Sequence, residues 1–248
     1  MSTFVLVHGA WHGGWVWDKV AEPLRQHGHT VLTPDLPGHG SDTTPIAQIT
    51  LQAYVDRVAA VIDSCREPVV LAGHSMGGIV VSQTAEERAD RISVLVYVCA
   101  FLPRDGECLV QWAEPDADAL VPKNFVFSED KTSVTLRPEG ITPSLFGDCQ
   151  REDVERATKL LVPQATAPLT TPVRLTAAKF GQVPRVYIEC LRDRAISPSI
   201  QRAMYSASKC NRVFTLDCDH SPMLSRPREL VECLLEASKL KQAQPVKR

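Results

Sequence analysis

The chain reads Pro68-Val69-Val70-Leu71-Ala72-Gly73-His74-Ser75-Met76-Gly77-Gly78, an apolar run followed by a glycine-flanked serine, and residues 77–88 beyond it can form a helix. A strand, a tight turn and a helix around G-x-S-x-G present the serine hydroxyl at the carboxyl edge of a sheet. The flanking glycines let the strand and the helix pass close to each other. The pattern therefore predicts an α/β fold and marks Ser75 as a candidate nucleophile.

Strand-like and helix-like stretches alternate on both sides of this turn. We expect strands at 4–7, 29–33, 69–72, 92–100, 185–191 and 212–216, and helices at 15–26, 50–65, 77–88, 198–206 and 227–240. Thr50 is the expected N-cap of its helix. Nearly continuous apolar strands suit a mostly parallel sheet that helices bury on both faces.

The alternation breaks down between about residues 101 and 182, where prolines cluster. We interpret about 103–182 as a lid inserted into one domain that spans 1–248. Within it, 124–127 and 133–136 are expected to pair as a hairpin, and 153–161 to form a short helix. The polar tail, 241–248, is expected to be frayed.

Composition narrows the function classes. Hydrophobic residues make up 44%, charged residues 23%, and the formal net charge is -2, as in ordinary globular proteins. This balance gives no electrostatic case for nucleic acid or an anionic membrane. The eight cysteines lack zinc-like spacing, the start lacks a signal-peptide pattern, and no apolar run reaches bilayer length. We expect a cytoplasmic monomer or homodimer with no metal or organic cofactor.

A serine hydroxyl needs a nearby base, and that base needs an acid to orient it. His220 is the only histidine after Ser75, which makes it the candidate base. Asp193, just past the expected strand 185–191, is the preferred acid, and Asp105 is the alternative. Asp217 and Asp219 lie near the histidine in sequence, but Asp219 is too close to reach its Nδ1.

The oxyanion formed by such a serine needs two backbone N–H donors. Met76, the residue after the nucleophile, supplies the first expected donor. The loop after the first strand, His8-Gly9-Ala10-Trp11, supplies the second, and Ala10 is our choice within it.

Three blocks carry a family resemblance: Val5-Leu6-Val7-His8-Gly9-Ala10-Trp11-His12-Gly13-Gly14-Trp15, Asp35-Leu36-Pro37-Gly38-His39-Gly40 and Gly73-His74-Ser75-Met76-Gly77-Gly78. They resemble the α/β-hydrolase superfamily, and more narrowly the branch of plant methyl esterases, hydroxynitrile lyases and bacterial esterase relatives. Residues 187–193 and Asp219-His220-Ser221-Pro222 fit the same branch. The resemblance implies an α/β-hydrolase fold with Ser75, Asp193 and His220 as a triad and a small pocket under the lid.

The same resemblance separates two activities. The lyases carry threonine where Gly9 stands and lysine where Ser221 stands, and these groups handle the cyanohydrin. Their absence favours a serine hydrolase that cleaves carboxylic esters of small or medium apolar substrates. The alternatives are a hydroxynitrile lyase-type C–C lyase, a non-catalytic small-ligand receptor on the same fold, and lactone or amide hydrolysis.

Candidate substrate contacts are less specific than the candidate catalytic residues. We expect Gly9, Trp11, Leu102 and Phe125 to bind the substrate. Five apolar residues are candidates to line the site, or alternatively only to hold the lid to the core: Phe101, Leu102, Phe125, Phe127 and Phe146.

Overall fold

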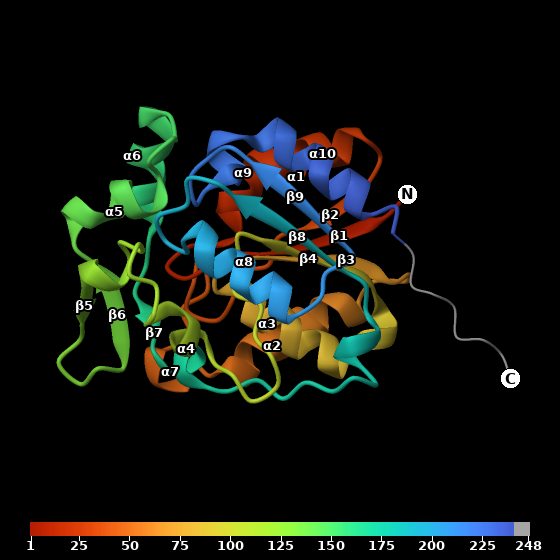
Figure 1. Ribbon diagram of the computed structural model, residues 1–248, viewed down its shortest axis with the longest axis horizontal. Coiled ribbons are helices and arrows are strands. Elements are labelled where there is room, and N and C mark those ends of the chain that lie inside the picture. The colour runs from red at the N-terminus through yellow and green to blue at the C-terminus, as the bar shows by residue number, and fades with distance from the viewer. Residues whose placement is uncertain (241–248) are drawn as a thin grey trace, which may run out of the picture.

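The central feature of the computed structural model, which describes residues 1–240, is a six-stranded sheet in the order β2-β1-β3-β4-β8-β9 (Figure 1). Every neighbouring pair in it is parallel. The strands are β1 (Thr3–Val7), β2 (Thr30–Leu32), β3 (Val69–His74), β4 (Ile92–Val98), β8 (Arg185–Cys190) and β9 (Arg212–Leu216). The predicted mostly parallel α/β sheet is confirmed.

Helices cover both faces of the sheet (Figure 1). One face carries α1 (Asp18–Gln26), α9 (Pro222–Ser225) and α10 (Pro227–Ala237), and the other carries α2 (Leu51–Asp63), α3 (Gly77–Glu87) and α8 (Pro198–Ala207). The predicted helix at 15–26 is divided, because residues Gly14–Trp17 form a 3-10 turn, η1, before α1. Thr50 caps α2 as predicted, since its side chain accepts a hydrogen bond from Ala53 N at 3.0 Å.

The core lies in the middle strands. All six residues of β3 are buried, and β4 is buried at every position but Ser93. Burial on both faces explains their continuous apolar sequence, since a strand with one wet face alternates instead. Each fully buried Val or Leu contributes roughly 1.5–3 kcal/mol, so these strands form a rigid base for the loops at their carboxyl ends.

The elements between β4 and β8 form the lid, which lies beyond the carboxyl ends of the strands (Figure 1). The predicted hairpin is confirmed: β5 (Phe125–Phe127) pairs with β6 (Ser133–Leu136) in antiparallel fashion, and β7 (Gln164–Ala165) adds a third strand. The predicted helix at 153–161 is α6 (Arg151–Leu160). Three helices of the lid were not predicted, namely α4 (Leu109–Ala113), α5 (Pro138–Leu145) and α7 (Ala167–Thr170), and outside the lid neither was α9.

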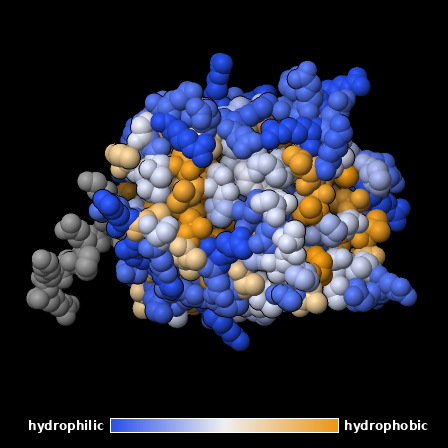
Figure 2. All heavy atoms as spheres, turned by 180° about the vertical axis from the view of Figure 1, so that it is seen from behind, coloured by the Kyte–Doolittle hydropathy of each residue, from blue (hydrophilic) through white to orange (hydrophobic). Residues whose placement is uncertain are grey.

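Short turns connect these elements: η2 (Ile46–Gln48), η3 (Ala89–Arg91), η4 (Pro122–Asn124) and η5 (Phe180–Gln182). Apolar side chains gather in more than one area of the surface seen in Figure 2, and one of these areas lies at the lid end of the molecule. Large apolar side chains of the lid that are exposed include Val126, Phe127 and Leu160. Among residues 1–240, none of the helices combines the length and apolar character needed to cross a bilayer. The predicted frayed tail, 241–248, lies outside the described residues.

Candidate active site

Ser75 occupies the sharp turn between β3 and α3. Its φ of 53° lies in the left-handed region that non-glycine residues rarely adopt. The turn is held by three backbone hydrogen bonds, in which Ser75 N–H donates to Val98 O and the Ser75 carbonyl accepts from the N–H groups of Gly78 and Phe101. A Cβ on Gly73 would lie 2.6 Å from Gly77 O, so only glycine lets strand and helix approach this closely. A strained backbone held this firmly is typical of a functional site.

His220 and Asp193 meet at the ends of β9 and β8. The His220 Nδ1–Asp193 Oδ2 distance is 2.7 Å, and the two side chains are 1% and 0% exposed. The carboxylate oxygen accepts this hydrogen bond, so the Nδ1–H group of His220 donates it. Asp193 is itself fixed by Ala195 N, Ile196 N and Gln201 Nε2, each of which donates to its carboxylate. The imidazole is thus held in one tautomer and one orientation.

Among the four aspartates considered from the sequence, Asp193 alone bonds to His220. Asp105 accepts a hydrogen bond from Leu175 N, and Asp217 pairs with Arg192 at 2.8 Å on the surface. Asp219, the residue before His220, has its carboxylate bonded to Ser225 Oγ instead. The arrangement therefore favours the preferred acid over its alternative.

Ser75 and His220 line one cavity of about 40 Å³ under the lid. Within residues 1–240 the Ser75 hydroxyl makes no hydrogen bond to the His220 ring, whose Nδ1 is directed to Asp193. In enzymes without bound substrate this contact is often long and tightens when substrate binds. The structure thus brings the three candidate residues to one edge of the sheet, from three different loops.

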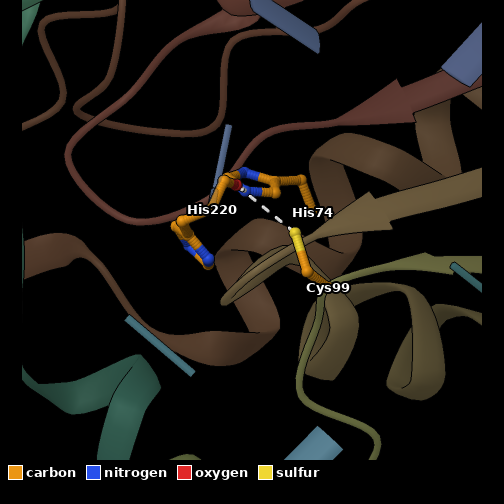
Figure 3. Close-up of side chains that lie close together, drawn as sticks. All are labelled: His74, Cys99 and His220. Atoms are coloured by element: carbon orange, nitrogen blue, oxygen red, sulfur yellow. Dashed lines mark hydrogen bonds between the residues drawn. The ribbon is translucent and has the colours of Figure 1, made fainter. Parts of the chain in front are cut away.

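The backbone of His220 is anchored from below by His74 and Cys99 (Figure 3). His74 Nε2 donates to the His220 carbonyl at 2.9 Å, and Cys99 Sγ donates to the same oxygen at 3.3 Å. The three side chains are close enough to be considered as metal ligands. However, His74 Nε2 and Cys99 Sγ both donate to the His220 carbonyl, and His220 Nδ1 bonds to Asp193, so these atoms have partners within the protein. The cluster therefore positions the histidine loop.

Ala10 and Met76 lie beside Ser75 in the cavity wall. The hydrogen bonds of residues 1–240 include none donated by the backbone N–H of either residue. His8 Nδ1 bonds to Gly9 O at 2.8 Å, and His8 Nε2 accepts from Leu36 N at 3.1 Å, which fixes Nδ1 as the donor. Because Gly9 O and Ala10 N belong to one peptide unit, His8 orients the Ala10 N–H. Burial lowers the pKa of His8 well below its usual value, which keeps the ring neutral.

The cavity wall is almost entirely apolar. Apart from Ser75 and His220, it is formed by Ala10, Trp11, Met76, Phe101, Leu109, Ala113, Val121, Pro122, Phe125, Leu145, Leu169, Ala195 and Ile196. None of these side chains carries a charge. Many come from the lid segments that sequence periodicity did not identify, including α4, α5 and α7.

The predicted substrate contacts divide into two groups. Trp11 and Phe125 line the cavity, as does Phe101. Gly9 and Leu102 do not: a Cβ on Gly9 would lie 2.8 Å from Ser75 Cβ, behind the serine, and Leu102 is fully buried in the core, its N–H 3.3 Å from Met204 Sδ. The expectation for Leu102 is corrected, because the chain turns it inward after β4.

The other two aromatic candidates also lie elsewhere. Phe127 is 51% exposed at the end of β5. Phe146 packs edge-on against His12, with a ring-centroid separation of 5.7 Å. Phe127 thus lies at the surface of the lid and Phe146 packs against the core, and neither side chain lines the cavity.

One carboxylate ties the lid to the histidine loop. Asp219 Oδ2 accepts from Asp148 N at 3.1 Å, and Asp219 Oδ1 accepts from Ser225 Oγ at 2.8 Å. Arg192, next to Asp193, pairs with Asp148 at 2.9 Å. The lid turn around Asp148 is therefore fastened to the two loops that bear His220 and Asp193.

Comparison with known proteins agrees with this architecture. Residues 4–233 match the model of the "Alpha/beta hydrolase family". The chain is 32% identical to methylesterase 9 of Arabidopsis thaliana, over 95% of this chain and 98% of the relative. It is 32% identical to salicylic acid-binding protein 2 of Nicotiana tabacum, over 94% and 95% of the two chains. The crystal structure of polyneuridine aldehyde esterase superposes with a TM-score of 0.89 at 29% identity, over 96% of this chain and 100% of that one.

Proposed function

The chain belongs to the alpha/beta hydrolase family, and from this membership and the geometry around Ser75 we propose that it is a serine esterase cleaving carboxylic esters of small apolar substrates. The observation that carries the proposal is the buried 2.7 Å contact between His220 Nδ1 and Asp193, next to a cavity that both His220 and Ser75 line. The methylesterase relatives, which are 32% and 34% identical to this chain, support ester cleavage.

In the proposed reaction, Ser75 Oγ attacks the ester carbonyl carbon while His220 Nε2 takes its proton. The C–O bond to the alcohol then breaks, and His220 returns the proton to the leaving oxygen. A water molecule attacks the acyl-enzyme with His220 again as the base, and the carboxylic acid leaves Ser75 free. Asp193 stabilises the positive imidazolium formed at each stage.

The N–H groups of Ala10 and Met76 are the proposed donors to the tetrahedral oxyanion. Two free donors that are fixed before the reaction stabilise the charge without reorganisation, and each is worth about 3–4 kcal/mol in enzymes where one was removed. Apart from the ester and one water molecule, the groups that take part in these steps all belong to this chain.

The substrate class follows from the cavity wall. No lysine or arginine lines the cavity, so a carboxylate or phosphate on the substrate would lose its water without gaining a partner. A neutral ester with a small apolar acyl group meets no such penalty. We therefore place neutral esters ahead of charged ones.

The test is turnover of p-nitrophenyl acetate by the wild-type protein and by Ser75→Ala. We expect loss of kcat by at least about 10³-fold with an unchanged circular dichroism melting curve. Ser82→Ala, which removes a buried hydroxyl remote from the cavity, is the control. Equal turnover by Ser75→Ala and wild type would remove Ser75 from the mechanism.

A small-ligand receptor is the second candidate, since one relative is called a salicylic acid-binding protein and the cavity is apolar. Stoichiometric ligand binding without ester turnover would favour it. A C–C lyase is less well supported. A threonine in place of Gly9 would put its Cβ 2.8 Å from Ser75 Cβ, and Ser221 is fully buried, which leaves little space for a lysine.

A further inference from the structure

Trp11 borders two cavities at once. It lines the apolar cavity of Ser75 and His220, and it also lines a second hollow of about 170 Å³, formed by β6, α5 and the connection from α6 to β7. We call this second hollow the lid groove; Leu136, Ile141 and Val162 are among its walls. The inner cavity is only about 40 Å³. Trp11 therefore lies between the apolar cavity of the candidate catalytic residues and a second hollow in the lid.

Several contacts hold the indole in this position. Trp11 Nε1 donates to Val134 O in β6 at 2.9 Å, and the Trp11 carbonyl accepts from Val162 N at 3.0 Å. The Phe125 ring lies with its centroid 6.2 Å away. Trp11 also has a φ of 64°, a conformation that costs a bulky residue free energy and persists only where surrounding contacts enforce it. Trp11 as a whole is only 6% exposed, so it is buried between the core and the lid.

We propose that Trp11 is a specificity-determining residue, whose indole closes the substrate pocket toward the lid groove and so sets the upper size limit of the apolar group of the ester. This inference rests on the proposed esterase function for its substrate but not for its geometry. Esters with a short apolar group fit the closed cavity. Longer chains meet the face of the indole, and without the ring they extend along Leu136 and Val162 toward solvent.

The decisive variant is Trp11→Gly, because glycine removes the ring and also suits a positive φ. Its kcat/KM is compared with that of wild type for p-nitrophenyl esters from acetate to decanoate, and for acetate esters of alcohols of rising length. The result is expressed as the ratio of the longest to the shortest ester, which cancels any general loss of activity. We expect this ratio to rise about fourfold for each additional methylene group that becomes buried, in whichever series points at Trp11.

Two further variants keep the result interpretable. Trp11→Leu retains apolar packing and should give a smaller rise, which protects the test if the glycine variant unfolds. Leu136→Trp added to Trp11→Gly refills the groove and should return the ratio toward that of wild type. Trp15→Phe is the matched control, since Trp15 borders neither cavity and its ratio should not change.

A binding experiment separates failure of the inference from failure of the proposed function. Neutral 2-alkanones of rising chain length are titrated calorimetrically into wild type and Trp11→Gly, with no turnover required. A gain in affinity for long ketones alone in the variant supports the partition, even if the wild type hydrolyses no ester. Unchanged chain-length profiles for ketones in Trp11→Gly and Trp11→Leu would overturn it, even if the esterase activity is real.

Discussion

The sheet and the lid differ in how firmly their residues are held and in what they contribute to the candidate active site. Ser75 and Asp193 follow β3 and β8, which are almost wholly buried, and His220 follows the edge strand β9, most of which is exposed. Hydrogen bonds to the neighbouring loops fix each of the three residues. The lid is held by three short strands, and Val126 and Phe127 in β5 are exposed. The contrast teaches that reacting groups are placed by the rigid core, whereas the lid supplies the shape of the apolar cavity. Changes in the core should therefore alter rate, and changes in the lid should alter selectivity.

The largest effect is expected from substituting an aspartate beside the candidate base, compared with the same substitution of an aspartate in the lid. Asp193→Asn should lower kcat for p-nitrophenyl acetate about 10⁴-fold, because an amide cannot stabilise the imidazolium and favours the wrong tautomer. Asp105→Asn, at the start of the lid where the carboxylate only accepts from Leu175 N, should stay within about threefold of wild type. Steady-state kinetics with both purified variants decides between them. A reversed order would assign the acid to Asp105.

An intermediate effect on kcat is expected from substituting a glycine in the first loop of the core, compared with a glycine in the lid. A Cβ on Gly9 would lie 2.8 Å from Ser75 Cβ and 3.0 Å from His74 Nδ1, whereas nothing lies within 4 Å of a Cβ on Gly147 in the lid. Gly9→Ala should displace the Ala10 N–H and lower kcat about 10²-fold, the usual effect of losing one oxyanion donor. Gly147→Ala should leave kcat and the melting temperature nearly unchanged. If both variants behave alike, the first loop does not position an oxyanion donor.

The smallest expected effect is a dependence of the free energy of unfolding on pH, caused by the buried histidines of the core. Burial lowers the pKa of His12 to about 4, and it lowers the pKa of His8 and His74 well below 6.5, while residues 101–182 contain no histidine. Between pH 6.5 and about 4, His12 binds a proton only in the unfolded chain, so the free energy of unfolding falls as the pH falls. The slope is at most about 1.4 kcal/mol per pH unit for each such group.

Urea unfolding at pH 7, 6 and 5 measures this slope. His12→Gln should flatten it by up to the contribution of one group, and His27→Gln, at an exposed imidazole, is the control. A wild-type stability that does not change over this range would mean that the buried imidazoles do not resist protonation.

The sequence predicted the core well because its signals are local. Continuous apolar runs identify strands buried on both faces, and the chain order of nucleophile, acid and base follows from the loop after each strand. His220 could be selected since no other histidine follows Ser75. The choice between Asp193 and Asp105 could not be made from spacing alone, because it depends on which strand lies beside β9.

The lid was predicted less completely for a physical reason. Helices α4 and α7 are five and four residues long, too short for a 3.6-residue period to be visible. Apolar residues of both helices line the cavity, and this placement depends on how the helices pack in the folded protein and not on a local sequence pattern. Leu102 shows the same limitation, because the sequence does not tell whether an apolar residue after β4 faces the cavity or the core. In the structure Phe101 lines the cavity and Leu102 is buried in the core.

The carboxylate of Asp219 has a mechanical consequence. It connects Asp148 in the lid to the segment that bears His220, and Arg192 connects the same lid residue to the neighbour of Asp193. A swing of that turn would pull directly on the imidazole and its acid. Any opening of the lid that leaves His220 and Asp193 in place must therefore keep these two contacts intact.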